Sequence, residues 1–243
     1  MSGHSHWATI KRKKAVTDLQ RGRIFSKLAR EIEVAAREGG DPELNPKLRV
    51  AIEKAKQARM PAENIERAIK RGTGELAGEK LEEVLYEAYG PGGIAVIIEG
   101  ITDNKNRSLM EIKQILQKFN GKLVSEGAVR WMFERKGCIT VDFKNQNSKF
   151  KSKEELELIA IESGAEDIYW HDDLLDIYTQ VEDLEKTKKS LEEKGVKIES
   201  FSLDWVPKEM VDADEKTKEL CKKLFEALDE TDTVQEIYSN LKL

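Results

Sequence analysis

A run of basic residues near the N-terminus is the part of this sequence whose residue types and spacing best suit a defined chemistry. It consists of Lys11, Arg12, Lys13 and Lys14, and it is followed at near-helical spacing by Arg21, Arg23 and Lys27. No acidic residue lies between Met1 and Thr17. Lysine and arginine offer positive charge and hydrogen-bond donors to phosphate oxygens, and such contacts position a protein on nucleic acid without reading its sequence. We therefore predict that these seven residues contact the phosphates of a nucleic acid.

The charge of the chain is divided unevenly along its length. Residues 1–74 hold 17 Lys and Arg against 9 Asp and Glu, a net of +8, whereas the whole chain carries −5. Residues 75–243 therefore carry −13. An acidic body is repelled by phosphate, so one end of the molecule is expected to make the contact. A solvated charge run without a partner is the alternative for an isolated Lys-Arg-Lys-Lys segment.

The sequence contains no convincing catalytic or metal-binding set, so we predict a non-enzymatic protein without a cofactor or a small-molecule substrate. His4 and His6 have no third ligand nearby, and His171 is expected in a solvated acidic turn. Gly90-Pro91-Gly92-Gly93 precedes a strand, whereas a phosphate-binding loop needs a helix after it. The two cysteines fit buried free thiols in a reducing compartment.

Apolar runs are too short to cross a membrane, and the longest spans residues 94–98. Nothing after Met1 resembles the apolar core of a signal peptide. The expected location is the cytoplasm, with no membrane partner. The sequence leaves the oligomeric state open.

The basic residues lie in a segment that reads as three short helices. Apolar stripes run through residues 24–35, 48–55 and 65–69, and the stop signals between them are Gly39-Gly40 and Met60-Pro61. Asn45-Pro46 starts the second helix, with proline in the first turn. These signals predict a small helical bundle ending in a Gly-containing linker, residues 73–80.

After Leu81 the periodicity changes to that of an α+β sandwich. A hairpin is expected across residues 81–99, with Glu82, Glu83 and Glu87 on its polar face, followed by a helix over 104–119 and a strand over 128–133. Residues 137–205 then read as β-α-β-β-α-β, the ferredoxin-like order. A helix over 214–228 and a strand over 234–241 complete the chain.

These elements predict a multidomain α+β protein with two ferredoxin-like sandwiches, one inserted in the other. The expected domains are 1–79, a basic helical domain; 80–134 with 206–243, a discontinuous α+β domain; and 135–205, the inserted domain. The discontinuity is expected because residues 81–133 supply too few elements to cover their own apolar faces.

Motifs spread over the whole chain resemble the YebC family, whose members include bacterial transcriptional regulators and the mitochondrial translational activator of cytochrome c oxidase subunit I. The matching residues are Gly3-His4-Ser5, Trp7, Ile10-Lys11, Arg21-Gly22-Arg23-Ile24-Phe25-Ser26-Lys27-Leu28, Ala35-Ala36-Arg37-Glu38-Gly39-Gly40-Asp41-Pro42, Met60-Pro61, Asn64-Ile65-Glu66-Arg67-Ala68-Ile69, Gly72-Thr73-Gly74, Tyr89-Gly90-Pro91-Gly92-Gly93, Thr102-Asp103-Asn104 and Trp131-Met132-Phe133. His6 departs from the pattern, since members commonly have lysine there.

The resemblance implies a three-domain, cytoplasmic, non-enzymatic protein. For some members it implies DNA binding and transcriptional control, and for others action on the ribosome or its message, including relief of stalled synthesis. A DNA-binding transcriptional regulator is therefore the first hypothesis. A ribosome- or RNA-associated translation factor is the second, and an enzyme is a distant third. The short helices include no firm helix-turn-helix motif, which keeps the second hypothesis open.

Overall fold

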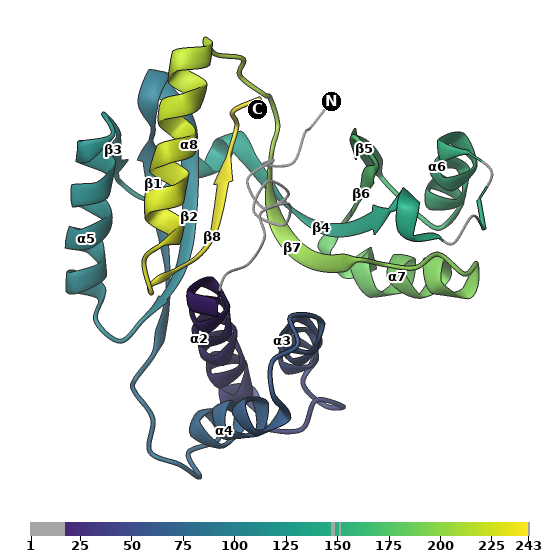
Figure 1. The fold of residues 1–243 in the computed structure, drawn as a ribbon, viewed down its shortest axis with the longest axis horizontal. Helices are drawn as coiled ribbons and strands as arrows, with labels where there is room; N and C mark the ends of the chain where they lie inside the picture. The colour runs from purple at the N-terminus through teal and green to yellow at the C-terminus, as the bar shows by residue number, and fades with distance from the viewer. Residues whose placement is uncertain (1–17, 147–148, 151, 243) are drawn as a thin grey trace.

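The computed structural model of this chain describes residues 18–242, except 147, 148 and 151. Figure 1 shows three groups of elements: a helical bundle, a sheet covered by two helices, and a second such sheet set to one side. The fold is thus mixed α and β, as the sequence predicts.

The bundle is formed by α2 (Asp18–Ala35), α3 (Pro46–Gln57) and α4 (Ala62–Gly72). Its core gathers the apolar stripes of all three helices, including Ile32, Leu48 and Ile65. The three predicted helices are confirmed.

The first sheet has the strand order β3-β1-β2-β8 and is antiparallel. Its strands are β1 (Glu82–Tyr89), β2 (Ala95–Thr102), β3 (Lys122–Val124) and β8 (Val234–Ser239). The helices α5 (Lys105–Lys118) and α8 (Glu215–Asp229) share an apolar core with one face of this sheet. The C-terminal segment thus returns to a sheet that starts at Glu82.

The turn between β1 and β2 is the predicted hairpin turn. Gly92 and Gly93 have φ angles of 68° and 77°, in the left-handed region that favours glycine. The Gly90 N–H donates to the carbonyl of Ile94 at 2.7 Å and closes the turn.

The second sheet has the order β5-β6-β4-β7, also antiparallel. Its elements follow the chain as β4 (Phe133–Asp142), α6 (Lys153–Glu162), β5 (Asp167–His171), β6 (Leu174–Thr179), α7 (Leu184–Glu193) and β7 (Ser200–Pro207). This is the ferredoxin-like arrangement predicted for the segment. Because Phe133 pairs with Pro207, the chain enters and leaves this unit at adjacent points.

The expected strand over residues 128–133 is wrong. Residues 130–132 form a 3-10 turn, and the outer strand of the first sheet is the short β3 instead. Backbone N–H groups of this segment are bonded by the Glu87 carboxylate rather than by a neighbouring strand. The alternation of large side chains there reflects packing of Val129 and Phe133 under the sheet, while Trp131 is exposed.

The division into residues 1–79, 80–134 with 206–243, and 135–205 stays a proposal. The pairings place the natural boundaries of the inserted unit about two residues further out on each side, because β4 begins at Phe133 and β7 ends at Pro207.

Candidate nucleic-acid interface

The residues predicted to contact phosphate divide into two groups. Lys11, Arg12, Lys13 and Lys14 lie outside the described residues. Arg21, Arg23 and Lys27 lie on α2.

Lys27 is buried, with 8% of the residue exposed. Its Nζ donates to the backbone carbonyl of Asp229 at 2.7 Å and to the Asp229 Oδ1 at 2.9 Å. In this structure the Lys27 ammonium therefore faces protein oxygens rather than solvent.

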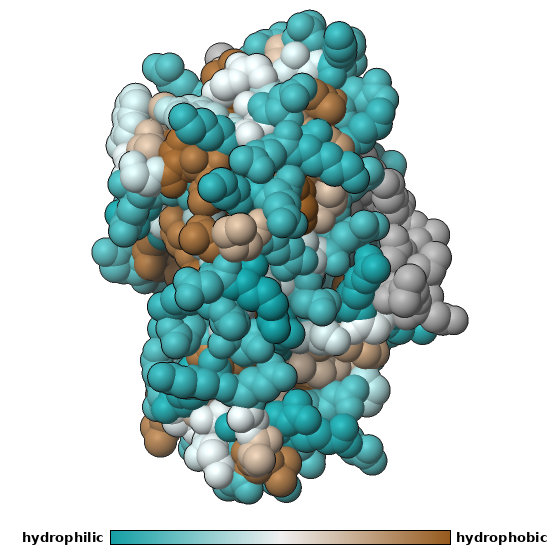
Figure 2. All heavy atoms as spheres, turned by 90° about the vertical axis from the view of Figure 1, so that its left-hand side faces the viewer, coloured by the Kyte–Doolittle hydropathy of each residue, from teal (hydrophilic) through white to brown (hydrophobic). Residues whose placement is uncertain are grey.

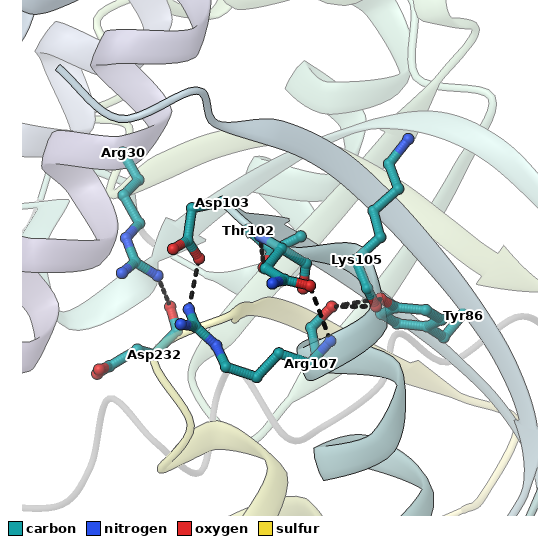
Figure 3. Close-up of polar contacts among 9 residues, drawn as sticks. Arg30, Tyr86, Thr102, Asp103, Lys105, Arg107 and Asp232 are labelled. Carbon is teal, nitrogen blue, oxygen red and sulfur yellow. Dashed lines mark hydrogen bonds and ion pairs between the residues drawn. The ribbon is translucent and has the colours of Figure 1, made fainter.

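Arg23 and Arg30 face the same acidic segment, residues 229–232, which we call the acidic loop. Arg23 lies 3.8 Å from the Glu230 carboxylate, and an Arg30 Nη donates to the carbonyl of Asp232 at 2.6 Å (Figure 3). Positions 23, 27 and 30 are spaced by four and three residues, so they share one face of α2. That face is turned toward the end of α8, which the sequence spacing alone does not reveal.

Arg21, by contrast, is exposed at the N-terminal end of α2. Of the three predicted contacts on this helix, Arg21 is the most open to solvent by burial class, whereas Arg23 is half-buried and Lys27 is buried.

Exposed cations on α3, on α4 and in the segment between these helices were missed by the sequence reasoning. No hydrogen bond or ion pair engages their side chains among residues 18–242 as described, and they are Lys56, Arg59, Arg67 and Lys70. Their signal was present in the sequence, because positions 67 and 70 lie opposite the buried Ile65 and Ala68. From the side shown in Figure 2, hydrophobic residues gather in the upper half, a mainly hydrophilic region lies below them, and a smaller pale-to-brown area is seen at the base.

A cavity of about 700 Å³ lies where the bundle meets both sheets. It is lined by seven carboxylates and three cations; the carboxylates are Glu31, Glu38, Glu83, Glu99, Glu185, Asp204 and Glu236. The charge of Glu31, 3.5 Å from the Lys54 ammonium, raises the pKa of Lys54 and keeps it protonated. The net negative lining opposes entry of a polyanion, so the cavity does not suit a phosphate backbone.

Within the cavity wall, Glu99 joins the two sheets. Its carboxylate accepts hydrogen bonds from Arg135 and from the Trp205 indole, both at 2.8 Å, and from the Tyr238 hydroxyl at 3.2 Å. Arg135 also stacks over the Trp205 ring, 5.1 Å from its centroid. These contacts fix the point where the inserted unit leaves the first sheet.

His171 differs from the solvated turn residue that the sequence suggests. Its side chain is 8% exposed, and Nε2 lies 3.2 Å from the Asp176 Oδ2. The other Asp176 oxygen accepts from the Thr140 hydroxyl at 2.7 Å. This small polar group is buried inside the second sheet.

The described part of the chain contains no group of three or more His, Cys, Asp or Glu side chains arranged to hold a metal ion. None of the helices in that same part is both long and apolar enough to span a membrane.

The fold and the charge distribution define a class of protein: a three-part α+β molecule with a cationic helical end and an acidic, two-sheet body. More specifically, the chain belongs to the TACO1/YebC family. The profile described as "TACO1/YebC protein N-terminal domain" matches residues 5–75, and that of the "TACO1/YebC second and third domain" matches residues 81–241. The predicted resemblance is confirmed.

Relatives from several bacteria match the full length of the chain. A "Probable transcriptional regulatory protein" of Halothermothrix orenii is 51% identical over 245 residues, covering 100% of this chain and 96% of the relative. One of Aquifex aeolicus is equally similar, with the same coverage. A crystal structure described as that of a conserved hypothetical protein from Aquifex aeolicus has a TM-score of 0.88 at 50% identity, covering 98% of this chain and 97% of that one.

Proposed function

We propose that this protein is a non-enzymatic regulator that binds nucleic acid through its basic N-terminal region and acts in transcriptional control. The relatives carry the name of probable transcriptional regulatory proteins, which supports a role as a regulator of transcription. Binding of nucleic acid through the N-terminal region is the more specific part of the proposal, and the uneven distribution of charge supports it. Positive residues concentrate in residues 1–74, while the body and its central cavity are acidic.

In this proposal Lys11, Arg12, Lys13 and Lys14 supply the main phosphate contacts, and Arg21 extends them along α2. Arg23 and Lys27 belong to the predicted set as well, but in this structure they face the acidic loop. The protein works in the cytoplasm, without a cofactor and without a substrate to turn over.

Action on RNA or the ribosome is the second candidate function. One observation bears on it: the cationic face of α2 is turned onto the acidic loop, so in this structure α2 is not placed as a recognition helix that reads base edges in a DNA groove. Contacts to phosphate alone serve DNA and RNA equally well.

Substitution of Lys11, Arg12, Lys13 and Lys14 by alanine tests the proposal. Each phosphate contact contributes about 0.9 to the slope of log affinity against log salt on duplex DNA, and about 0.7 on single strands. The variant is therefore expected to bind every sequence more weakly and to flatten that slope by up to about 3–4. Fluorescence anisotropy over a salt series, on a duplex DNA and a single-stranded RNA, measures both quantities.

A matched control removes four exposed lysines from the acidic body, Lys186, Lys189, Lys222 and Lys223, and should leave the slope nearly unchanged. The proposal would be wrong if the fourfold alanine variant kept both the affinity of the wild type for nucleic acid and its salt slope. Co-sedimentation with ribosomes at physiological salt, compared with duplex DNA binding, decides between the two targets. Turnover in a broad activity screen, abolished by one point substitution, would contradict the non-enzymatic part.

A further inference from the structure

The acidic loop meets the cations of α2 in the way that a phosphate backbone would. Lys27 donates hydrogen bonds to the backbone carbonyl and to one carboxylate oxygen of Asp229, and Arg30 donates to the backbone carbonyl of Asp232. Glu230 lies beside Arg23. Each of the three cations on this helix face thus lies near at least one oxygen of the acidic loop. Three of the four residues in that loop carry a carboxylate.

The bundle is attached to the rest of the molecule largely by polar contacts. Among the residues that the structure describes, its apolar core gathers residues between Phe25 and Ile69, and Val50 packs against the core of the inserted unit. Further links are a hydrogen bond from Arg37 to the carbonyl of Leu81 and an ion pair between Lys188 and Glu53 at 3.2 Å. Interfaces between domains that are this polar resemble transient interfaces, and relative domain motion is their default behaviour.

We propose that the acidic loop, residues 229–232, is an internal phosphate mimic that covers a second nucleic-acid-binding face of the protein. Arg23, Lys27 and Arg30 form that face. When the loop leaves, the phosphates of the bound nucleic acid replace its oxygens, so that binding and release of the bundle from the body are coupled. The inference rests on the proposed function, because it assumes that the basic end of the molecule meets nucleic acid.

The same contacts could serve only to hold the bundle against the body, a role we call a structural clamp. The two roles differ in how the affinity for nucleic acid responds when the acidic loop is loosened. In a clamp, loosening leaves the affinity for nucleic acid unchanged. In a mimic, loosening exposes cations and strengthens binding, since each newly available phosphate contact adds to the electrostatic term.

The test uses the full-length chain with Asp229→Ala and Glu230→Ala combined. The control combines Glu192→Ala and Glu193→Ala, which removes the same charge from an exposed part of α7. Binding is measured by anisotropy on a labelled 20-base-pair DNA duplex and a labelled 20-nucleotide RNA over a salt series. Hydrogen–deuterium exchange of the acidic loop and of α2 is followed in parallel, and circular dichroism confirms folding.

The loop variant is expected to bind about three- to tenfold more tightly, with a salt slope steeper by about 1–3, while the control stays within error of the wild type. Exchange in the acidic loop should rise. Lys27→Met provides an independent check, because it also loosens the loop but removes a cation. It should raise exchange without any gain in affinity.

Three other combinations of binding by the wild type and by the loop variant also have a definite meaning. If the wild type binds nucleic acid and the loop variant binds equally well, the mimic is overturned and the proposed function stands. If the loop variant binds and the wild type does not, the mimic is supported strongly. If neither binds either probe, the proposed function fails and the mimic with it.

Discussion

The Glu87 carboxylate is buried on the face of β1 opposite the helices and holds the loop that precedes β4. It accepts hydrogen bonds from the N–H groups of Gly127, Val129 and Arg130 at 2.6, 2.7 and 2.9 Å. Burial raises the pKa of Glu87, but these three hydrogen bonds and the nearby Arg130 charge outweigh burial and leave the pKa below its ordinary value. The sequence pattern predicts Glu87 on a solvated face, so its role became visible only with the loop in place.

Glu87→Gln should lower the free energy of unfolding at pH 7 by about 1–3 kcal/mol, because the amide replaces one of two acceptor oxygens with a donor. A carboxyl with a depressed folded pKa stabilises the protein above its unfolded pKa and loses that contribution as pH falls through the folded pKa. The difference between wild type and variant should therefore shrink below about pH 4.5. Urea denaturation from pH 7 to pH 3 measures this, and a difference that persists at low pH would contradict it.

Cys221 is fully buried beneath the hairpin turn, where burial raises the pKa of its thiol to about 11. Since the thiolate is the reactive form, Cys221 should resist iodoacetamide in the native protein at pH 8 and react only after denaturation. Mass spectrometry after timed labelling, with a sample in 8 M urea as the positive control, reports the outcome. Native labelling as fast as that of free cysteine would refute the buried placement.

Among the elements, the junction between α2 and α3 depends on one side chain, that of Asn45. Its Oδ1 caps α3 by accepting from the Leu48 N–H at 3.1 Å, and its Nδ2 donates to the carbonyls of Ala35 and Gly39, both at 2.8 Å. The cap itself was foreseeable from Asn45-Pro46. The hydrogen bonds from Asn45 Nδ2 to the carbonyls of Ala35 and Gly39 depend on how the two helices pack, and the local sequence does not predict them.

Asn45→Ala should cost about 1 kcal/mol for the lost cap and at least about as much again for the two carbonyls left without a partner. Asn104 offers a matched control, because it caps α5 from an exposed position by accepting from the Arg107 N–H at 3.1 Å. Asn104→Ala should cost only the cap, about 1 kcal/mol. Chemical denaturation of both variants gives the comparison, and equal losses would show that the Nδ2 bonds add nothing.

Helices were more predictable from the sequence than the edges of the sheets. The stripes through Ile32, Leu48 and Ile65, together with local stop signals, fix the helices because each signal lies within a few residues of its effect. The β3 strand has three residues and pairs with β1 only because the chain returns there after α5. The segment around Val129 takes its shape from a carboxylate some forty residues earlier. No local pattern encodes either relation.

At the scale of the whole molecule, the sequence identifies the basic residues of α2 but not the group that faces them. Residue type and spacing alone single out Arg21, Arg23 and Lys27. The partner of Lys27 stays hidden, because Lys27 and Asp229 are 202 residues apart. The sequence thus reveals a cationic helix, and only the tertiary fold reveals that one of its faces is covered.

The inserted unit should fold without the rest of the chain. Residues 133–207 contain all four strands and both helices of the second sheet, whose apolar core includes Ile139, Leu156 and Ile177. A fragment with these bounds is expected to unfold cooperatively by circular dichroism and to give dispersed amide resonances. The domain assignment would be wrong if this fragment were unfolded while residues 75–134 were stably folded alone.

The pairing of β2 with β8 has a consequence for the order in which the protein is completed during synthesis. The N–H of Ala95 is bonded by the side chain of Asn240, 145 residues later, and nearly all of β2 is buried. Until β8 emerges from the ribosome, β2 is an apolar edge strand, the kind of edge that pairs with other chains. The inserted unit, whose strands all precede β8, is complete by then. A premature stop near residue 230 would thus release a chain whose bundle and inserted unit are complete but whose first sheet ends in an unpaired apolar strand.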